Sequence, residues 1–213
     1  MNEAEPEAYR IGNIPFLGLT IYLDSRPLIP RPETEYWVEK LLEERLAPAT
    51  LTAEKSSVLL ASLGQTISSR TPRPPSASLI QVLDLCAGSG AIGCAILKEC
   101  PNAEVSFGEI DQAHEATILK NIRENGLDET RAHIGIGDLF TPFSGEQFDF
   151  IASNPPYIPL DRALDASVTD FEPALALRSG KDGLDVLRRI ALELPKYLKR
   201  RGQAWIECDS PAA

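Results

Sequence analysis

The segment Asn154-Pro155-Pro156-Tyr157 carries groups that could present a flat nitrogen atom for methylation. An amide nitrogen is a poor nucleophile, because its lone pair is delocalised into the carbonyl group. The Asn154 side-chain oxygen and the Pro155 carbonyl could accept its two hydrogens and fix its plane. Proline has no N–H and a fixed φ, so these carbonyls are held in place. Tyr157 could pack on the flat group, and catalysis would rest on alignment without a general base. The alternative is a rigid turn with no chemistry.

A glycine-rich loop with the sequence DLCAGSG begins at Asp84, at the end of an apolar run. Glycines allow a tight turn and a close approach of the backbone to a ligand. Gly88, Gly90 and Gly93 also satisfy GxGxxG, so a dinucleotide site is an alternative. Asp84 would place negative charge near a pyrophosphate, whereas it could accept a hydrogen bond from an ammonium or from loop amides. S-adenosylmethionine carries an ammonium and a sulfonium and no phosphate, so the loop favours that cofactor.

Further acids follow the next two apolar runs. Glu109 lies about 20 residues past the loop, where a carboxylate can accept ribose hydroxyls, and Asp111 is its rival. Asp138 could accept a hydrogen bond from an adenine amino group, while Leu139 packs against the ring. Each acid alone could be a solvated loop residue. Three acids at three successive strand ends favour the cofactor site.

The elements that would position these residues alternate between strands and helices from residue 79 onward. We expect strands at 80–85, 103–110, 131–137, 147–154 and 202–208, and helices at 91–99, 114–125 and 184–200. Such alternation predicts an α/β fold, with a mostly parallel sheet and helices on both faces. In these sheets ligands bind beyond the carboxyl ends of the strands, where every motif above lies.

The chain before residue 79 is organised differently. Residues 8–24 alternate apolar and polar side chains around glycines, which predicts a β-hairpin. A helix with Glu33 and Glu35 in its first turn follows, because apolar residues then recur at helical spacing to Leu46. Residues 47–78 are rich in Ser and Pro and are expected to be a largely disordered insertion, with a helical turn near 58–63. The predicted division is 1–46, 47–78 and 79–213.

The composition argues against nucleic acid, a membrane span and a metal site. The 213 residues carry a formal net charge of −10, which disfavours nucleic acid, since its phosphates would be repelled. No apolar run is long enough for a membrane span. The four cysteines lack metal-binding spacing and read as reduced thiols, so no metal is expected. His114 and His133 stand alone and are predicted to be surface or strand residues.

Several segments together resemble the HemK-type methyltransferases: LIPRPETE at 28–35, DLCAGSGAIG, GDLF, NPPY and FEPALALRSGKDGLD at 171–185. The resemblance covers nearly the whole chain apart from 47–78. These enzymes methylate the side-chain amide of the glutamine in the Gly-Gly-Gln loop of class 1 peptide chain release factors. NPPY alone is shared with DNA adenine methyltransferases, whereas the PRPETE and FEP segments together are more specific.

The resemblance implies a class I, Rossmann-like methyltransferase fold with S-adenosylmethionine as cofactor and S-adenosylhomocysteine as product. It assigns cofactor binding to Cys86, Ala87, Gly88, Ser89, Gly90 and Glu109, with Leu139 near the adenine and Asn154 at the transferred methyl group. Asn154, Pro155, Pro156 and Tyr157 would hold the substrate glutamine, and Arg31 and Glu33 would support the site. The family usually has Asp in place of Glu109 and a small Gly/Thr pair in place of Cys86-Ala87.

The ends of the chain depart from the family, whose members begin with a helical domain and continue past the fifth strand. Here Glu207 lies at the expected place, but six residues later the chain closes, so we expect the C-terminal strands to be missing. The insertion resembles eukaryotic elaboration, which favours the organellar branch and mitochondria over cytoplasm. A monomer is the default expectation. The alternative functions are N6-adenine methylation of nucleic acid and an inactive cofactor-binding fragment.

Overall fold

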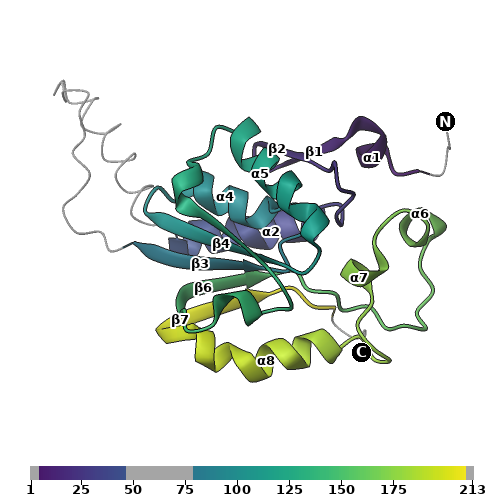
Figure 1. Ribbon diagram of the computed structural model, residues 1–213. Coiled ribbons are helices and arrows are strands. Elements are labelled where there is room, and N and C mark those ends of the chain that lie inside the picture. The colour runs from purple at the N-terminus through teal and green to yellow at the C-terminus, as the bar shows by residue number, and fades with distance from the viewer. Residues whose placement is uncertain (1–4, 47–78, 210–213) are drawn as a thin grey trace.

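A parallel β-sheet with helices on both faces forms the centre of the computed structural model, which describes residues 5–46 and 79–209 (Figure 1). Its strands are β3 (Ile80–Leu85), β4 (Ala103–Glu109), β5 (Ala132–Ile136), β6 (Phe148–Ser153) and β7 (Leu198–Ile206). They lie in the order β5-β4-β3-β6-β7, and every neighbouring pair is parallel. The chain reverses its direction of travel across the sheet between β3 and β6, and such switch points are where ligands bind in open α/β sheets.

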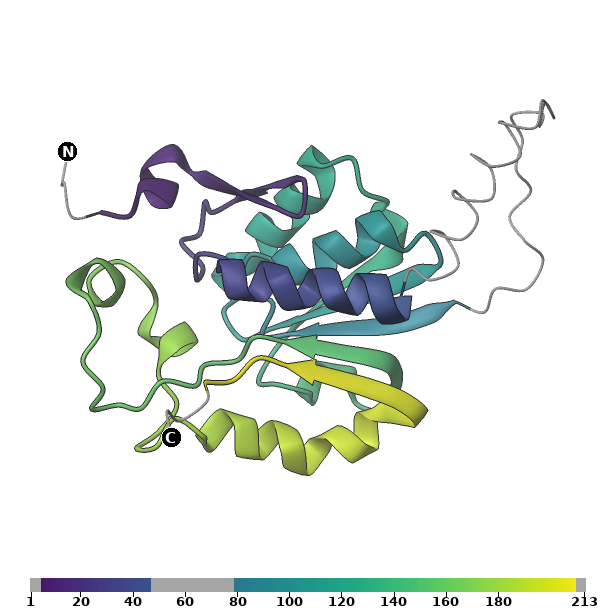
Figure 2. The same ribbon diagram turned by 180° about the vertical axis from the view of Figure 1, so that it is seen from behind.

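Two layers of helices cover the sheet (Figures 1 and 2). One face carries α2 (Pro32–Leu41), which continues as a π-helical turn (Leu42–Leu46), with α4 (Ala91–Glu99) and α5 (Glu115–Glu124); the other carries α8 (Asp185–Tyr197). Short helices α6 (Ala166–Thr169) and α7 (Ala174–Leu177) lie beyond the carboxyl ends of the strands. Single 3-10 turns occur at Gln112–His114, Glu129–Arg131 and Thr141–Phe143.

Alternate residues of the central strand pack into two separate apolar cores. Val82 faces the core built with α2, α4 and α5, whereas Leu83 and Leu85 face the core built with α8. Phe107 of β4 packs in the first core, and Ile190 of α8 packs in the second. Because successive strand side chains point to opposite faces, both surfaces of this sheet must be apolar, as in other buried parallel sheets. The expected α/β architecture is therefore confirmed.

The N-terminal hairpin is confirmed, but it is shorter than expected. Strands β1 (Asn13–Phe16) and β2 (Leu19–Tyr22) are antiparallel, whereas the preceding segment is a helix, α1 (Glu7–Ile11). The prediction of strand from residue 8 was wrong, because Gly12 adopts φ +86° and closes a helical turn through its N–H bond to the Ala8 carbonyl. The hairpin is tied to α5, since the Tyr22 N–H donates to Asn121 Oδ1 at 2.7 Å.

Helix α8 ends earlier than the prediction of 184–200. Its last residue is Tyr197, and β7 begins at Leu198, which pairs with Phe148. Pro195 removes one helical N–H, and the Tyr197 ring stacks on Phe140 with centroids 4.4 Å apart. Strand pairing therefore competes successfully with the helical pattern over the last turn.

The Ser/Pro-rich segment 47–78, expected to be largely disordered, lies outside the described residues. Among the helices described, none is long and apolar enough to cross a membrane. The four cysteines, Cys86, Cys94, Cys100 and Cys208, are free thiols, as the spacing predicted.

Candidate active site

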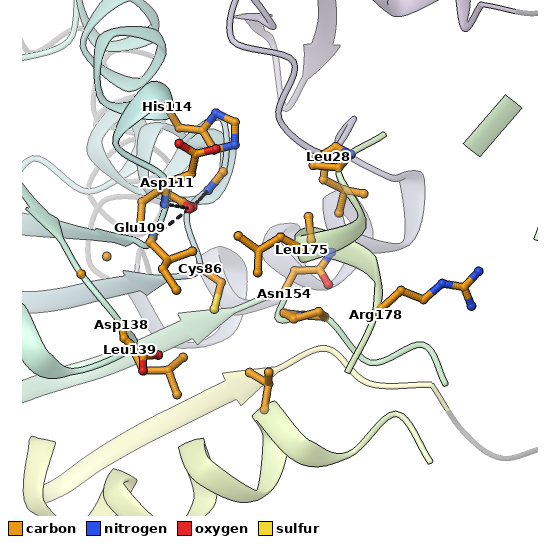
Figure 3. A pocket seen from close by; sticks show the side chains of 18 of the residues that line it. Leu28, Cys86, Glu109, Asp111, His114, Asp138, Leu139, Asn154, Leu175 and Arg178 are labelled. Atoms are coloured by element: carbon orange, nitrogen blue, oxygen red, sulfur yellow. Dashed lines mark hydrogen bonds between the residues drawn. The ribbon is translucent and has the colours of Figure 1, made fainter. Parts of the chain in front are cut away.

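A pocket opens beyond the carboxyl ends of β3, β4, β5 and β6 (Figure 3). Of the residues that sequence reasoning placed near a ligand, eight line this pocket: Cys86, Gly88, Glu109, Asp111, Asp138, Leu139, Asn154 and Pro156. The others do not line it: Asp84, Ala87, Ser89, Gly90, Pro155 and Tyr157. Residues that the sequence did not assign to the site complete it: Leu28, Gly108, Ile110, His114, Gly137, Pro173, Leu175, Ala176, Arg178, Val186 and Arg189. The pocket therefore joins the strand ends to the segment before α2, to α7 and to α8.

The glycine-rich loop forms a strained turn between β3 and α4. Cys86, Gly88 and Gly90 have φ values of +62°, +55° and +77°, a region that favours glycine. The loop is tied down at both sides, because the Ala87 N–H donates to the Gly108 carbonyl at 2.9 Å and Asn121 Nδ2 donates to the Ser89 carbonyl at 2.8 Å. Burial raises the pKa of the Cys86 thiol to about 12, so it stays protonated near neutral pH.

Asp84 lies beneath the loop and does not line the pocket. It is fully buried, and its Oδ2 accepts the N–H of Gly93 in the first turn of α4 at 2.8 Å. Burial raises its pKa to about 8, and among the described side chains its Oδ1 is the buried polar atom without a partner. Of the two partners expected for Asp84, an ammonium or loop amides, the structure supplies a helix amide.

The same contacts decide how the GxGxxG pattern is used. In dinucleotide-binding folds a helix N-terminus directs free N–H groups at phosphate, but here Asp84 takes the Gly93 N–H. A Cβ on Gly93 would lie 2.2 Å from the Phe107 ring, so this glycine is needed for close packing of helix on sheet. The glycines therefore serve loop geometry and packing.

Glu109 and Asp111, the two alternative ribose ligands, both line the pocket, but their carboxylates accept different numbers of hydrogen bonds from the backbone. Glu109 is largely buried; its Oε2 accepts the Gly88 N–H at 2.7 Å, and its Oε1 accepts the Ile110 and Asp111 N–H groups at 2.8 and 2.9 Å. A carboxylate has about four acceptor positions, so about one remains for a ligand hydroxyl. Asp111 accepts the Ala113 N–H at 2.9 Å and is exposed. The longer glutamate side chain thus also fixes the turn after β4.

Asp138 and Leu139 line the pocket and contact α8. Asp138 forms an ion pair with Arg189 at 2.6 Å, with both side chains about half exposed. Leu139 adopts φ +49° and lines the pocket, although only 8% of it is exposed. A ligand amine that bonded Asp138 would therefore share that carboxylate with Arg189.

Asn154 follows β6 and has a defined orientation. Its Nδ2 donates to Thr34 Oγ1 at 3.0 Å, and Thr34 Oγ1 donates to Glu207 Oε2 at 2.6 Å. Among the described residues no donor bonds Asn154 Oδ1, and that oxygen is not among the buried unpartnered atoms. The oxygen is therefore accessible as an acceptor, whereas the amide nitrogen is occupied by Thr34.

The other three residues of the tetrapeptide differ in how they are placed relative to the pocket. Pro156 lines the pocket, Pro155 is buried, and the Tyr157 hydroxyl donates to Glu207 Oε1 at 3.0 Å. Burial, followed by the nearby Glu207 carboxylate, raises the pKa of Tyr157 well above its ordinary value. Tyr157 is thus a neutral donor to Glu207, and its ring is not among the residues that line the pocket.

His114 was expected at the surface or in a strand, and that prediction was wrong. It is 6% exposed, lines the pocket, and its Nδ1 lies 2.8 Å from Ser25 Oγ. Ser25 belongs to the segment after β2, so the sequence around His114 does not indicate that His114 is buried. His133 is an exposed residue of β5, as predicted. No cluster of acids, histidines and cysteines among the described residues could hold a metal ion.

Known proteins resemble this chain in sequence and in fold. The family model "Methyltransferase small domain" matches residues 61–170. The chain is 34% identical over 207 residues to the release factor glutamine methyltransferase of Thermodesulfovibrio yellowstonii, covering 95% of this chain and 63% of that protein. The corresponding protein of Clostridium acetobutylicum is 36% identical over 213 residues, covering 98% and 64%.

Another relative is named for a different substrate. The ribosomal protein uL3 glutamine methyltransferase of Bradyrhizobium diazoefficiens is 32% identical over 199 residues, covering 93% of this chain and 56% of that protein. The chain thus spans less than two thirds of the curated relatives it matches. Among solved structures, the catalytic domain of hMettl16 in complex with MAT2A 3'UTR hairpin 1 has a TM-score of 0.55 at 18% identity, covering 90% of this chain and 61% of that one. At that identity the likeness supports the fold alone.

Proposed function

Because the chain belongs to the methyltransferase small domain family, we propose that it transfers a methyl group from S-adenosylmethionine to the side-chain amide of a glutamine. The proposed acceptor is the glutamine of the Gly-Gly-Gln loop in a class 1 peptide chain release factor. The observation that carries the proposal is the Asn154 amide, whose Nδ2 is bonded to Thr34 and whose oxygen is accessible. An acceptor oriented in this way selects a group with an N–H to donate.

The pocket suits the cofactor by charge and by hydrogen bonding. Three acids, Glu109, Asp111 and Asp138, line it, and one of its two arginines, Arg189, is paired with Asp138. A pyrophosphate would meet net negative charge, whereas a ligand with an ammonium, a sulfonium and ribose hydroxyls finds acceptors. When bound, S-adenosylmethionine supplies the electrophilic methyl group and leaves as S-adenosylhomocysteine.

The chain's own residues would then align the acceptor. Asn154 Oδ1 accepts one amide N–H, the Pro155 carbonyl is the proposed acceptor of the other, and Pro156 lines the pocket beside them. Holding both hydrogens fixes the amide plane and turns its nitrogen toward the methyl group, which is the alignment that lowers the barrier. The proton leaves to solvent after the transfer, so no general base is required.

The names of the relatives support a glutamine acceptor, and they differ in the protein that carries it. Relatives at 34 and 36% identity are named for release factors, and one at 32% is named for ribosomal protein uL3. Because all three names specify methylation of a glutamine, the chemistry proposed is the same for either protein. The release factor is the proposed substrate because the more similar relatives carry that name.

A methylation assay tests the proposal directly. The chain is incubated with cofactor labelled in the methyl group and with a release factor, the same factor with its loop glutamine replaced by alanine, or uL3. We expect label on the intact factor, none on the alanine form, and mass-spectrometric localisation to the loop glutamine. Asn154→Ala should abolish labelling, whereas the matched surface variant His133→Gln, exposed on β5, should label normally.

Other results would redirect the proposal. Label that persists on the alanine form removes the glutamine assignment, and label on uL3 alone transfers it to the ribosomal protein. Methylation of a nucleic acid at moderate salt would favour adenine as acceptor, although the net charge of −10 disfavours nucleic-acid binding. Cofactor binding without turnover on any of these substrates would favour a cofactor-binding fragment. The monomeric state and the mitochondrial location stay predictions, tested by sedimentation and by fractionation.

A further inference from the structure

We propose that Glu207 is a positioning residue that sets the orientation of the Asn154 amide through the Thr34 hydroxyl. The proposal rests on the proposed function, because it concerns how the acceptor nitrogen is held. Neither Glu207 nor Thr34 lines the pocket. Both act on the acceptor site through Asn154, which does.

Glu207 receives three donors from elements far apart in the sequence. Its Oε2 accepts Thr34 Oγ1–H at 2.6 Å and Trp37 Nε1–H at 2.8 Å, both from α2, and its Oε1 accepts the Tyr157 hydroxyl at 3.0 Å. Its own N–H donates to the Ser153 carbonyl at 2.9 Å, one residue before Asn154. The carboxylate therefore lies where α2, the end of β6 and the end of β7 meet.

The direction of each hydrogen bond follows from the number of protons. A hydroxyl has one proton, and an ionised carboxylate has none, so Thr34 must donate to Glu207. Thr34 then offers Asn154 a lone pair alone, and Asn154 must turn its NH₂ group toward Thr34. The Asn154 oxygen is thereby directed away from Thr34, as an acceptor for a substrate N–H.

Without the carboxylate the orientation would no longer be specified. Thr34 could donate its proton to Asn154 Oδ1, and the amide would rotate so that its NH₂ group faced the pocket. An NH₂ group opposite the substrate NH₂ cannot accept a hydrogen bond. Glu207 thus selects between an Asn154 that accepts the substrate amide and one that repels it.

The same chain of hydrogen bonds favours the charge that develops in the reaction. The acceptor nitrogen gains positive charge as the new N–CH₃ bond forms and the S–CH₃ bond breaks. Hydrogen bonds in series polarise one another, so the Glu207 charge makes Asn154 Oδ1 a stronger acceptor at that moment. Thr34 is 3% exposed, which keeps water from competing for its proton.

The decisive comparison distinguishes orientation of Asn154 through the Thr34 hydrogen bonds from simple tethering of α2 to β7. Thr34→Val keeps the shape and removes the hydroxyl, Thr34→Ser keeps the hydroxyl, and Glu207→Met removes the acceptor, which lets Thr34 point its proton at Asn154. Trp37→Phe is the matched control, because it removes a hydrogen bond to the same Glu207 oxygen and leaves the Thr34–Asn154 bond intact. For each variant kcat and KM for the protein substrate, the cofactor Kd and the melting temperature are measured.

We expect Thr34→Val and Glu207→Met to lower kcat by about 10-fold to 100-fold, less than the loss of about 100-fold to 1,000-fold that follows removal of a hydrogen-bond donor at the reacting centre itself. The cofactor Kd should stay within about twofold, Thr34→Ser should recover most of kcat, and Trp37→Phe should lose much less of it. The orienting role is refuted, and Glu207 is a structural tether, if Thr34→Val keeps its kcat or if Thr34→Ser fails to recover it. The same conclusion follows if Trp37→Phe lowers kcat as much as Thr34→Val does.

A second measurement is independent of turnover. The Asn154 side-chain NH₂ signals in an NMR spectrum should exchange slowly with solvent in the unsubstituted chain, because one hydrogen is bonded to Thr34. They should exchange faster in Thr34→Val and Glu207→Met, and exchange at equal rates in all three proteins would refute the orientation. If the unsubstituted chain methylates no glutamine protein, the proposed function fails while this measurement still decides the role of Glu207.

Discussion

The Arg31 guanidinium is paired with the buried Glu172 carboxylate, and this contact joins the segment before α2 to the segment before α7. The Glu172 side chain is 1% exposed, and its second oxygen accepts the Ile29 N–H at 3.2 Å. Directly after it, Pro173 and Ala176 line the pocket. The ion pair therefore fixes one wall of the candidate active site against the residues that lead into α2.

Removal of Arg31 should cost more stability than removal of Glu172. Arg31→Met leaves a buried carboxylate without its counter-charge, and we expect a loss of about 3 kcal/mol in the free energy of unfolding. Glu172→Gln keeps an acceptor for Ile29 and leaves Arg31 one-third exposed, so its cost should be smaller. Urea unfolding of both single variants and the double variant measures the coupling.

The exposed pair Lys120–Asp24 supplies the control. Its side chains are 37% and 53% exposed, so Lys120→Met should cost less than about 1 kcal/mol. Equal losses for Arg31→Met and Lys120→Met would mean that the Arg31–Glu172 contact does not stabilise the wall of the pocket.

Gly183 packs directly against the acceptor segment. It has φ +80°, and a Cβ there would lie 2.2 Å from the Tyr157 carbonyl oxygen. We expect Gly183→Ala to displace Tyr157 and to lower kcat by about 10-fold or more, since alignment of the acceptor carries the rate. Activity assays at a temperature where the variant is folded, checked by circular dichroism, measure this.

Gly126→Ala separates displacement from backbone strain. Gly126 has φ +65°, and a Cβ there would meet nothing within 4 Å, so the substitution introduces the strain alone. Its stability should fall by about 1 kcal/mol, and its kcat should not change. A Gly183→Ala protein with normal kcat would show that the loop after α7 does not hold the acceptor segment in place.

The pattern of the sequence predicted the elements that build the site better than the contacts that orient it. Periodicity and turn residues were sufficient for β3 to β6 and for α4, and motif position placed Glu109, Asp138 and Asn154 at one edge of the sheet. These are local signals, and parallel topology converts them into a common location.

Contacts between distant segments left no such signal. Thr34 and Glu207 are 173 residues apart, and Arg31 and Glu172 are 141 apart. Their side chains suit many surface positions equally well, so neither spacing nor composition pairs them. His114 was misjudged for the same reason, because its burial depends on Ser25, a residue from another element. The bond from the Tyr157 hydroxyl to Glu207 was likewise not predicted, and packing of the Tyr157 ring on the acceptor stays a prediction.

Cys86 occupies a backbone conformation that suits glycine, with φ +62°. A residue with a Cβ costs about 1–2 kcal/mol in this region, so Cys86→Gly should be more stable than Cys86→Ala by about 1 kcal/mol. Both variants lack the sulfur atom, so its loss does not contribute to the difference in stability between them. Thermal unfolding measures it, with Ala116→Gly as control.

Ala116 is an exposed residue of α5, where glycine costs about 1 kcal/mol relative to alanine. The two alanine-to-glycine comparisons should therefore have opposite signs. If glycine at position 86 destabilises as it does at 116, the left-handed turn at the start of the loop is not strained.

Asp84 should make the stability of the protein without ligands fall as pH rises. Burial raises its pKa to about 8 from an ordinary 3.8, so the folded state retains a proton that the unfolded state releases. The contribution is complete below about pH 4 and is lost as pH rises to about 8, with a slope of up to about 1.4 kcal/mol per pH unit. Asp84→Asn never ionises and can still accept the Gly93 N–H. Its stability relative to the natural chain should therefore increase from pH 4 to pH 8 and then level off.

Asp128→Asn is the control of opposite sign, because a hydrogen bond from Thr130 lowers the pKa of the Asp128 carboxyl. Its contribution is present above the ordinary pKa of 3.8 and is lost as pH falls through the lowered pKa of the folded state, so the variant should differ from the natural chain at neutral pH and approach it only below that ordinary value. Urea midpoints measured from about pH 2 to about pH 9 give both difference curves. A flat curve for Asp84→Asn would mean that Asp84 is ionised in the fold, and its unpartnered oxygen would then need a cation or an ordered water at the base of the loop.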